Sequence, residues 1–83
     1  MDQARRERIR ELIRVLESTQ GQIHDLWVEE EKEFDSRSAP SKETRSGQDS
    51  KGAVEDLEQA TYLIQDAIEA MQSAIGPTSE AAP

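Results

Sequence analysis

The side chains best suited to metal chemistry are five glutamates in two clusters. Glu29, Glu30 and Glu33 form the first cluster, and Glu55 and Glu58 form the second. Carboxylate oxygens are ligands that Mg²⁺ prefers in proteins. A Mg²⁺-dependent nucleotide hydrolase that uses Glu30, Glu33, Glu55 and Glu58 is therefore one alternative. A run of glutamates is, however, more typical of a solvated helix face.

The spacing of these acids only partly matches that of all-α nucleotide pyrophosphatases. Those enzymes hold Mg²⁺ with acids on helical faces and have a second pair in Glu-x-x-Asp form, whereas this chain has Glu-x-x-Glu at 55–58. His24 is the only histidine and lacks the Glu-x-x-His spacing of di-iron bundles, because position 21 is glycine. The chain has no cysteine and no phosphate-cradling glycine loop. We therefore predict a protein that is not an enzyme, with no catalytic residue, metal site or cofactor.

A group of arginines near the start of the chain could bind phosphate. Arg5, Arg6 and Arg10 belong to five arginines within residues 1–20, and guanidinium groups pair well with phosphate oxygens. This predicts, as an alternative function, a protein that binds or sequesters a phosphorylated nucleotide. A structural role competes with it, because an antiparallel hairpin would bring these arginines near Asp66 and Glu69.

Two aromatic residues are candidates for contact with a protein partner. Trp27 lies on the apolar face of the first predicted helix, and Phe34 lies near its end. Packing in the core is the simpler role for both. A partly exposed tryptophan would instead be a natural binding hot spot.

Apolar residues recur in steps of three and four, which predicts two long helices. The first covers 3–35 and is capped by Asp2; the second covers 51–75 and ends at Gly76 and Pro77. The serine-rich segment 36–50 is predicted to be a loop, so 1–75 forms a helical hairpin and 76–83 a flexible tail. The predicted oligomer core consists of Ile9, Leu12, Ile13, Leu16, Ile23, Leu26, Trp27, Leu57, Ile64, Ile68 and Met71.

Alanine recurs every seven residues in the second helix, at positions 53, 60, 67 and 74. A small residue in each heptad lets a neighbouring helix approach closely. We therefore expect the second helix to pack tightly along its length, most simply against the first helix. Alanine is also simply a good helix former.

The expected fold class is all-α, an antiparallel helical hairpin that dimerises into a four-helix bundle. The chain has 83 residues, of which 34% are hydrophobic, and it has no cysteine. Such a short chain buries a small core, and chains of this kind often need a disulfide, a metal or a partner subunit for stability. Two helices also bury only one stripe each, and a second hairpin with C2 symmetry would cover the rest.

The charge balance limits the classes of partner. A net charge of −8 argues against duplex nucleic acid and anionic membranes as targets. No apolar run is long enough to span a membrane, and the start of the chain is polar rather than an apolar signal. These features predict a cytoplasmic protein.

The order of features over residues 5–75 resembles small acidic helical-hairpin proteins encoded by bacteriophages and other mobile elements. The features are Arg5-Arg6, leucine and isoleucine heptads, Glu33-Phe34-Asp35, Pro40 and the segment 53–60. The resemblance implies an accessory protein that binds a host regulatory or defence component. A non-enzymatic, oligomeric interaction protein is therefore the favoured function.

Overall fold

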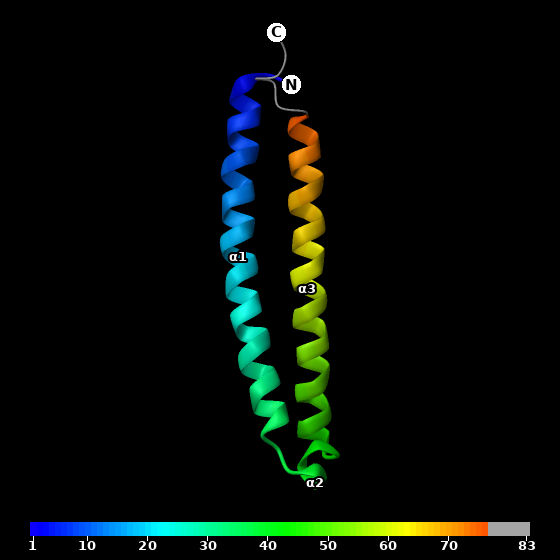
Figure 1. Ribbon diagram of the computed structural model, residues 1–83. Helices are drawn as coiled ribbons and strands as arrows, with labels where there is room; N and C mark the ends of the chain where they lie inside the picture. The colour runs from blue at the N-terminus through cyan, green and yellow to red at the C-terminus, as the bar shows by residue number, and fades with distance from the viewer. Residues whose placement is uncertain (77–83) are drawn as a thin grey trace.

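The computed structural model describes residues 1–76 and contains helices and no strand over that range. The elements are α1 (Gln3–Asp35), α2 (Ala39–Lys42) and α3 (Arg45–Ile75). Figure 1 shows α1 and α3 side by side in opposite directions, with the short α2 at the turn between them. The all-α class and the helix–loop–helix architecture are confirmed. The predicted tail 76–83 lies, apart from Gly76, outside the described residues.

The ends of the hairpin follow the capping signals in the sequence. The Asp2 side chain accepts a hydrogen bond of 2.8 Å from the backbone N–H of Arg5 and so caps α1. Gly76 ends α3 with φ of 89°, a backbone conformation that favours glycine. In the part of the chain that the structure describes, no helix has an apolar stretch long enough to cross a membrane.

Each long helix faces the other with one regular stripe of residues, here called the contact stripe. Its members are buried or half-buried and follow each other in steps of three and four, which is the coiled-coil repeat. On α1 the contact stripe comprises Arg6, Ile9, Ile13, Leu16, Gln20, Ile23, Trp27, Glu30 and Phe34. On α3 it comprises Gly47, Ser50, Val54, Leu57, Thr61, Ile64, Ile68, Met71 and Ile75.

Hydrogen bonds between the helices show which residues lie at the same level. The Gln20 side chain donates to the Thr61 carbonyl at 3.1 Å, and the Ser50 hydroxyl donates to the Glu30 carboxylate at 2.5 Å. In these pairs the two residue numbers add to 81 and 80. The same register places Ile13 level with residue 68 of α3, near the middle of the N-terminal half of α1.

The hairpin encloses very little apolar core. Among the described residues only Ile13 and Ile68 are buried hydrophobic side chains, with 7% and 2% of their surface exposed. No side chain in this part of the chain is fully buried. The rest of the contact stripe is half-buried at best, as expected when one helix covers one stripe of another.

The predicted loop 36–50 is wrong for most of its length. α2 lies within it, with Ser38 as N-cap and Pro40 in its first turn, and α3 begins at Arg45 rather than residue 51. The Thr44 side chain accepts a hydrogen bond from the Gly47 N–H and caps α3. Serine and glycine have low helix propensity, but the cap and the packing of the first turns of α3 outweigh that preference.

Gly47 allows the turn to close. A Cβ at this position would meet the Ser41 carbonyl oxygen and would lie 2.8 Å from the Lys42 Cα, both of which are backbone atoms. α2 therefore packs directly on the first turn of α3 because residue 47 has no side chain. This close approach fixes the path of the connection between the two long helices.

Candidate interaction surfaces

The hairpin has two exposed sides, one along each edge of the contact stripe, and they differ in composition. In an antiparallel pair, the flanking heptad positions of one helix lie on the same side as the equivalent positions of the other. The polar side carries Arg10, Glu17, His24 and Glu31 from α1 and Lys51, Glu58, Gln65 and Gln72 from α3. The apolar side carries Leu12, Val15, Thr19 and Leu26 from α1 and Ala53, Ala60, Leu63, Ala67 and Ala74 from α3.

The apolar side is open to solvent in the hairpin. Leu12 and Leu26 are each 53% exposed, Val15 is 60% exposed and Leu63 is 56% exposed. Single exposed leucines are ordinary, but a contiguous apolar surface is typical of a protein interaction site. These side chains come from both helices and lie along the same side of the hairpin, which is why this side is a candidate interaction surface.

Charged residues border the apolar side at both ends of α1. Arg5 and Arg8 line a shallow hollow together with Met1, Ile9 and Leu12, which places both arginines at the N-terminal end of this side. Glu29 and Glu33 occupy the equivalent helix positions about six turns after Arg8 and about eight turns after Arg5. All four are exposed. One end of the surface is therefore basic and the other acidic.

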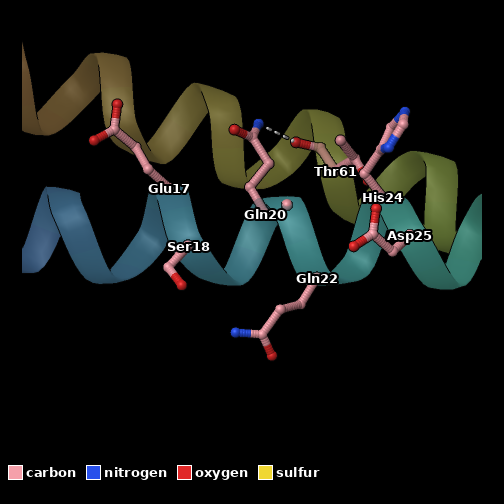
Figure 2. A pocket seen from close by; sticks show the side chains of 8 residues that line it. Glu17, Ser18, Gln20, Gln22, His24, Asp25 and Thr61 are labelled. Atoms are coloured by element: carbon pink, nitrogen blue, oxygen red, sulfur yellow. Dashed lines mark hydrogen bonds between the residues drawn. The ribbon is translucent and has the colours of Figure 1, made fainter.

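The polar side has a shallow depression near the middle of the hairpin. Figure 2 shows Gln20 reaching from α1 to Thr61 on α3, with Glu17, His24 and Asp25 along the same helix. The lining residues are polar or charged, and the depression is open to solvent. It has the character of a hydrated surface on which another polar molecule could dock, without an enclosed cavity for a small ligand.

Two polar contacts interrupt the apolar contact stripe. The Gln20 side chain donates to Thr61 and also to the Gln65 side-chain oxygen, each at 3.1 Å. Glu30 accepts from Ser50, which is only 6% exposed. The apolar pattern in the sequence weakens at these positions, and the structure shows that each is occupied by a matched donor and acceptor. Such polar layers favour one register of two helices over others.

The Ser50–Glu30 contact leads to a stability prediction. Ser50→Ala removes a hydrogen bond to a half-buried carboxylate, which costs about 1.5–3 kcal/mol, and alanine returns roughly 0.5 kcal/mol in helix propensity. We expect the free energy of unfolding, measured by urea denaturation, to fall by about 1–2 kcal/mol. Ser18→Ala, at an exposed position of α1, is the matched control and should not lower it. Equal effects of the two changes would contradict this role for Ser50.

The three arginines predicted to bind phosphate do not gather at one place. Arg5 borders the apolar side and lies 3.8 Å from the Asp2 carboxylate. Arg6 belongs to the contact stripe, and its buried Nε has no hydrogen-bond partner among the described residues. Arg10 lies half-buried on the polar side. Glu69, one of the expected ion-pair partners, accepts a hydrogen bond from Gln65 on its own helix.

Trp27 and Phe34 both lie in the contact stripe and are half-buried. The Trp27 ring packs edge-on against His24, with ring centres 5.3 Å apart, and its buried Nε1 has no hydrogen-bond partner within residues 1–76. The Lys42 ammonium lies 5.4 Å from the centre of the Phe34 ring. Phe34 therefore helps to hold the turn, while one edge of Trp27 reaches the polar side beside His24.

The glutamates considered for Mg²⁺ are used in other ways. Glu30 accepts from Ser50, and Glu33 lies 3.4 Å from the Arg37 guanidinium. Within residues 1–76, no group of three or more histidine or acidic side chains is arranged to hold a metal ion. Glu55 and Glu58 lie on α3 and do not join the first cluster.

Val15 and Leu63 are two surface residues that the predicted core omits. Both lie outside the contact stripe, and the main stripe of each helix already contains most of the apolar residues of that helix. Their spacing in the sequence indicates that they lie on the apolar side. Val15 follows Leu12 by three residues, and Leu63 follows Ala60 by three. Each pair widens the apolar face of its helix on the same side of the hairpin.

The alanine repeat does not lie under α1 as expected. Ala53 and Ala60 are half-buried at the edge of the contact stripe, whereas Ala67 and Ala74 are exposed. Tight packing of α3 against α1 therefore does not depend on all four. The alanines instead line the apolar side along the length of α3.

Comparison of the chain with protein-family models, with curated proteins and with solved structures finds no match.

Proposed function

We propose that this chain is a non-enzymatic interaction protein that works as a homodimeric four-helix bundle. The proposal rests on how few apolar side chains the hairpin buries and how many it leaves exposed. The described residues bury two apolar side chains, Ile13 and Ile68, while Leu12, Val15 and Leu26 are more than half exposed. Burial of apolar area is the main favourable term in folding, and without cysteines a partner subunit is the simplest way to increase it.

Oligomerisation can be tested by sedimentation equilibrium at several protein concentrations. We expect a dimer at micromolar concentrations and a Tm that rises with protein concentration, because association stabilises only the folded chain. A monomer that melts cooperatively, with a Tm independent of concentration up to about 100 μM, would contradict the proposal. At that concentration even a weak dimer, with a Kd in the micromolar range, would form.

The polar side provides the surface for a second protein. It would remain outside a bundle formed through the apolar side, and Glu17, Asp25, Glu31 and Glu58 on or beside it are exposed or half-exposed acids. Such a surface suits a partner with a basic surface, since complementary charge speeds association and favours the right partner. The resemblance to phage-encoded hairpins favours a host regulatory or defence component as that partner.

Partner binding can be tested with the immobilised dimer in a host lysate. One protein should be retained in stoichiometric amount at low salt and released at high salt, because exposed charges are screened. Glu17→Gln with Asp25→Gln should abolish its retention, whereas Ser18→Ala should not. Retention that is unaffected by the two acid substitutions would exclude this surface.

A further inference from the structure

We infer that the apolar side binds a second copy of this chain in one symmetric register, with α1 antiparallel to its own counterpart and α3 antiparallel to its own counterpart. The inference rests on the proposed dimeric function and specifies its geometry. It depends on the order of residues along the apolar side. When two copies of this surface meet in opposite directions, apolar residues face apolar residues and basic residues face acidic residues.

The complementarity is clearest along α1. A row of residues spaced seven apart runs along the apolar side of α1. In chain order these residues are Arg5, Leu12, Thr19, Leu26 and Glu33. If a second copy of α1 runs in the opposite direction with Thr19 opposite Thr19, then Leu12 lies opposite Leu26. Arg5 then lies opposite Glu33. A twofold axis through Thr19 therefore matches both the apolar and the charged parts of the surface, as an isologous contact requires.

A second pair of charges follows the same symmetry to within one residue. Arg8 and Glu29 lie on either side of Thr19 at nearly equal distances along α1. Both are exposed, and within residues 1–76 the side chain of neither takes part in a hydrogen bond or an ion pair. Arg5 and Glu33 do contact Asp2 and Arg37, but these pairs lie within one segment, and Arg5, Asp2 and Glu33 are more than 60% exposed. Exposed pairs of this kind hold their members weakly.

The same axis gives complementary shapes on α3. In the register of the hairpin, Thr19 lies level with Tyr62. A twofold axis at that level brings the exposed edges of three half-buried residues of the contact stripe opposite alanines of the second copy. The resulting pairs are Leu57 with Ala67, Ile64 with Ala60, and Met71 with Ala53. Large side chains opposite small ones fill the space between close helices. Such packing accounts for the alanines that recur every seven residues beside the contact stripe, on a face that α1 covers only in part.

The area available suits a stable dimer. Arg5 and Glu33 are separated by about 40 Å at 1.5 Å per residue, and two helices side by side are about 20 Å wide. The apolar side is thus roughly 800 Å² per chain, which is the size of a standard specific interface. In the other twofold arrangement the axis runs along the helices, α1 is parallel to its counterpart, and α1 packs against α3 of the second copy. That arrangement brings neither Leu12 to Leu26 nor Arg5 to Glu33.

Single cysteines test the register directly, because the natural chain contains none. A disulfide requires Cα atoms within about 7 Å, so Thr19→Cys should form a covalent dimer readily under mild oxidation. Leu12→Cys alone and Leu26→Cys alone should not, whereas a mixture of the two should form a disulfide-linked heterodimer. Ser18→Cys is the control, since Ser18 neighbours Thr19 but points away from α3 (Figure 2).

Charge reversal tests the ends of the surface independently. Arg5→Glu with Arg8→Glu should weaken the homodimer by about tenfold or more, and so should Glu29→Arg with Glu33→Arg. Mixing the two variants should restore dimers of mixed composition, because acidic ends then meet basic ends. All effects should diminish at high salt.

The outcomes separate this register from the dimer itself. A wild-type dimer in sedimentation, with no preferred disulfide at Thr19→Cys and no effect of charge reversal, would overturn the register and leave the dimeric function standing. A wild-type chain that sediments as a monomer would overturn both. Disulfide formation at Thr19→Cys, together with selective pairing of the charge-reversed variants, would support the inferred contact.

Discussion

Replacing Leu12 and Leu26 together with glutamate is expected to weaken dimerisation by about a thousandfold. Each leucine is 53% exposed in the hairpin, so burying the rest of each side chain contributes roughly 1 kcal/mol. A symmetric dimer contains four such side chains, and about 4 kcal/mol corresponds to three orders of magnitude in Kd. Because neither residue belongs to the contact stripe, α1 and α3 should still pair. Sedimentation equilibrium over a range of concentrations measures the change in Kd.

Tyr62→Gln provides the matched control for this prediction. Tyr62 is 57% exposed, which is close to the value for the two leucines, but its position in the heptad puts it beside the polar side. Its replacement removes an exposed aromatic ring without touching the proposed contact. A Kd that rises equally in both variants would mean that general hydrophobicity, rather than the apolar side, drives association. An unchanged Kd in the leucine variant would place the dimer contact elsewhere.

Gly47→Ala is expected to lower the free energy of unfolding by about 2 kcal/mol. Forcing an extra carbon into a packed site costs about 1–3 kcal/mol or more. Here the atoms in the way are the Ser41 carbonyl oxygen and the Lys42 backbone, which cannot rotate aside as a side chain could. Alanine would return about 1 kcal/mol in helix propensity, so the net loss reflects a large steric cost. Urea denaturation at one fixed protein concentration measures it.

Two other glycines serve as controls for helix propensity. A Cβ at Gly21 or Gly52 would meet nothing within 4 Å, and both residues lie inside long helices without positive φ. Gly21→Ala and Gly52→Ala should therefore each raise the free energy of unfolding by up to about 1 kcal/mol. If Gly47→Ala also stabilised the protein, the packing of α2 on α3 would have to be looser than the structure shows.

The balance of a small core and a large open apolar side has a physical consequence for this protein. A hairpin whose described part buries only Ile13 and Ile68 gains little from hydrophobic burial on its own, so its stability should depend on concentration. The Ser50–Glu30 contact contributes about 1–2 kcal/mol net of helix propensity, and each neutral hydrogen bond of Gln20 contributes about 1 kcal/mol. They specify the register of the hairpin, and thereby the positions at which the apolar side and its charged ends are presented.

The helices and their outer ends could be predicted from the sequence because they depend on local chemistry. Asp2 caps α1 and Gly76 ends α3 as predicted, since a capping side chain and a positive φ involve only neighbouring residues. The steps of three and four gave most of the contact stripe for the same reason. The sequence pattern predicts a helix from residue 51, whereas α3 begins six residues earlier, at Arg45. Ser46, Gly47 and Ser50 are poor helix formers, and their helical state depends on contacts with Thr44, α2 and Glu30.

Local pattern thus determined that this chain forms two long helices, where they begin and end at the termini, and which residues are apolar on each. Only the tertiary structure decided what those residues face. It placed Trp27 between the helices, separated Arg5 from Arg10, and turned the alanine repeat away from α1. The physical reason is that helical periodicity fixes angles around one axis, whereas the register and relative rotation of two helices depend on contacts between residues far apart in the sequence, such as Gln20 with Thr61 and Glu30 with Ser50.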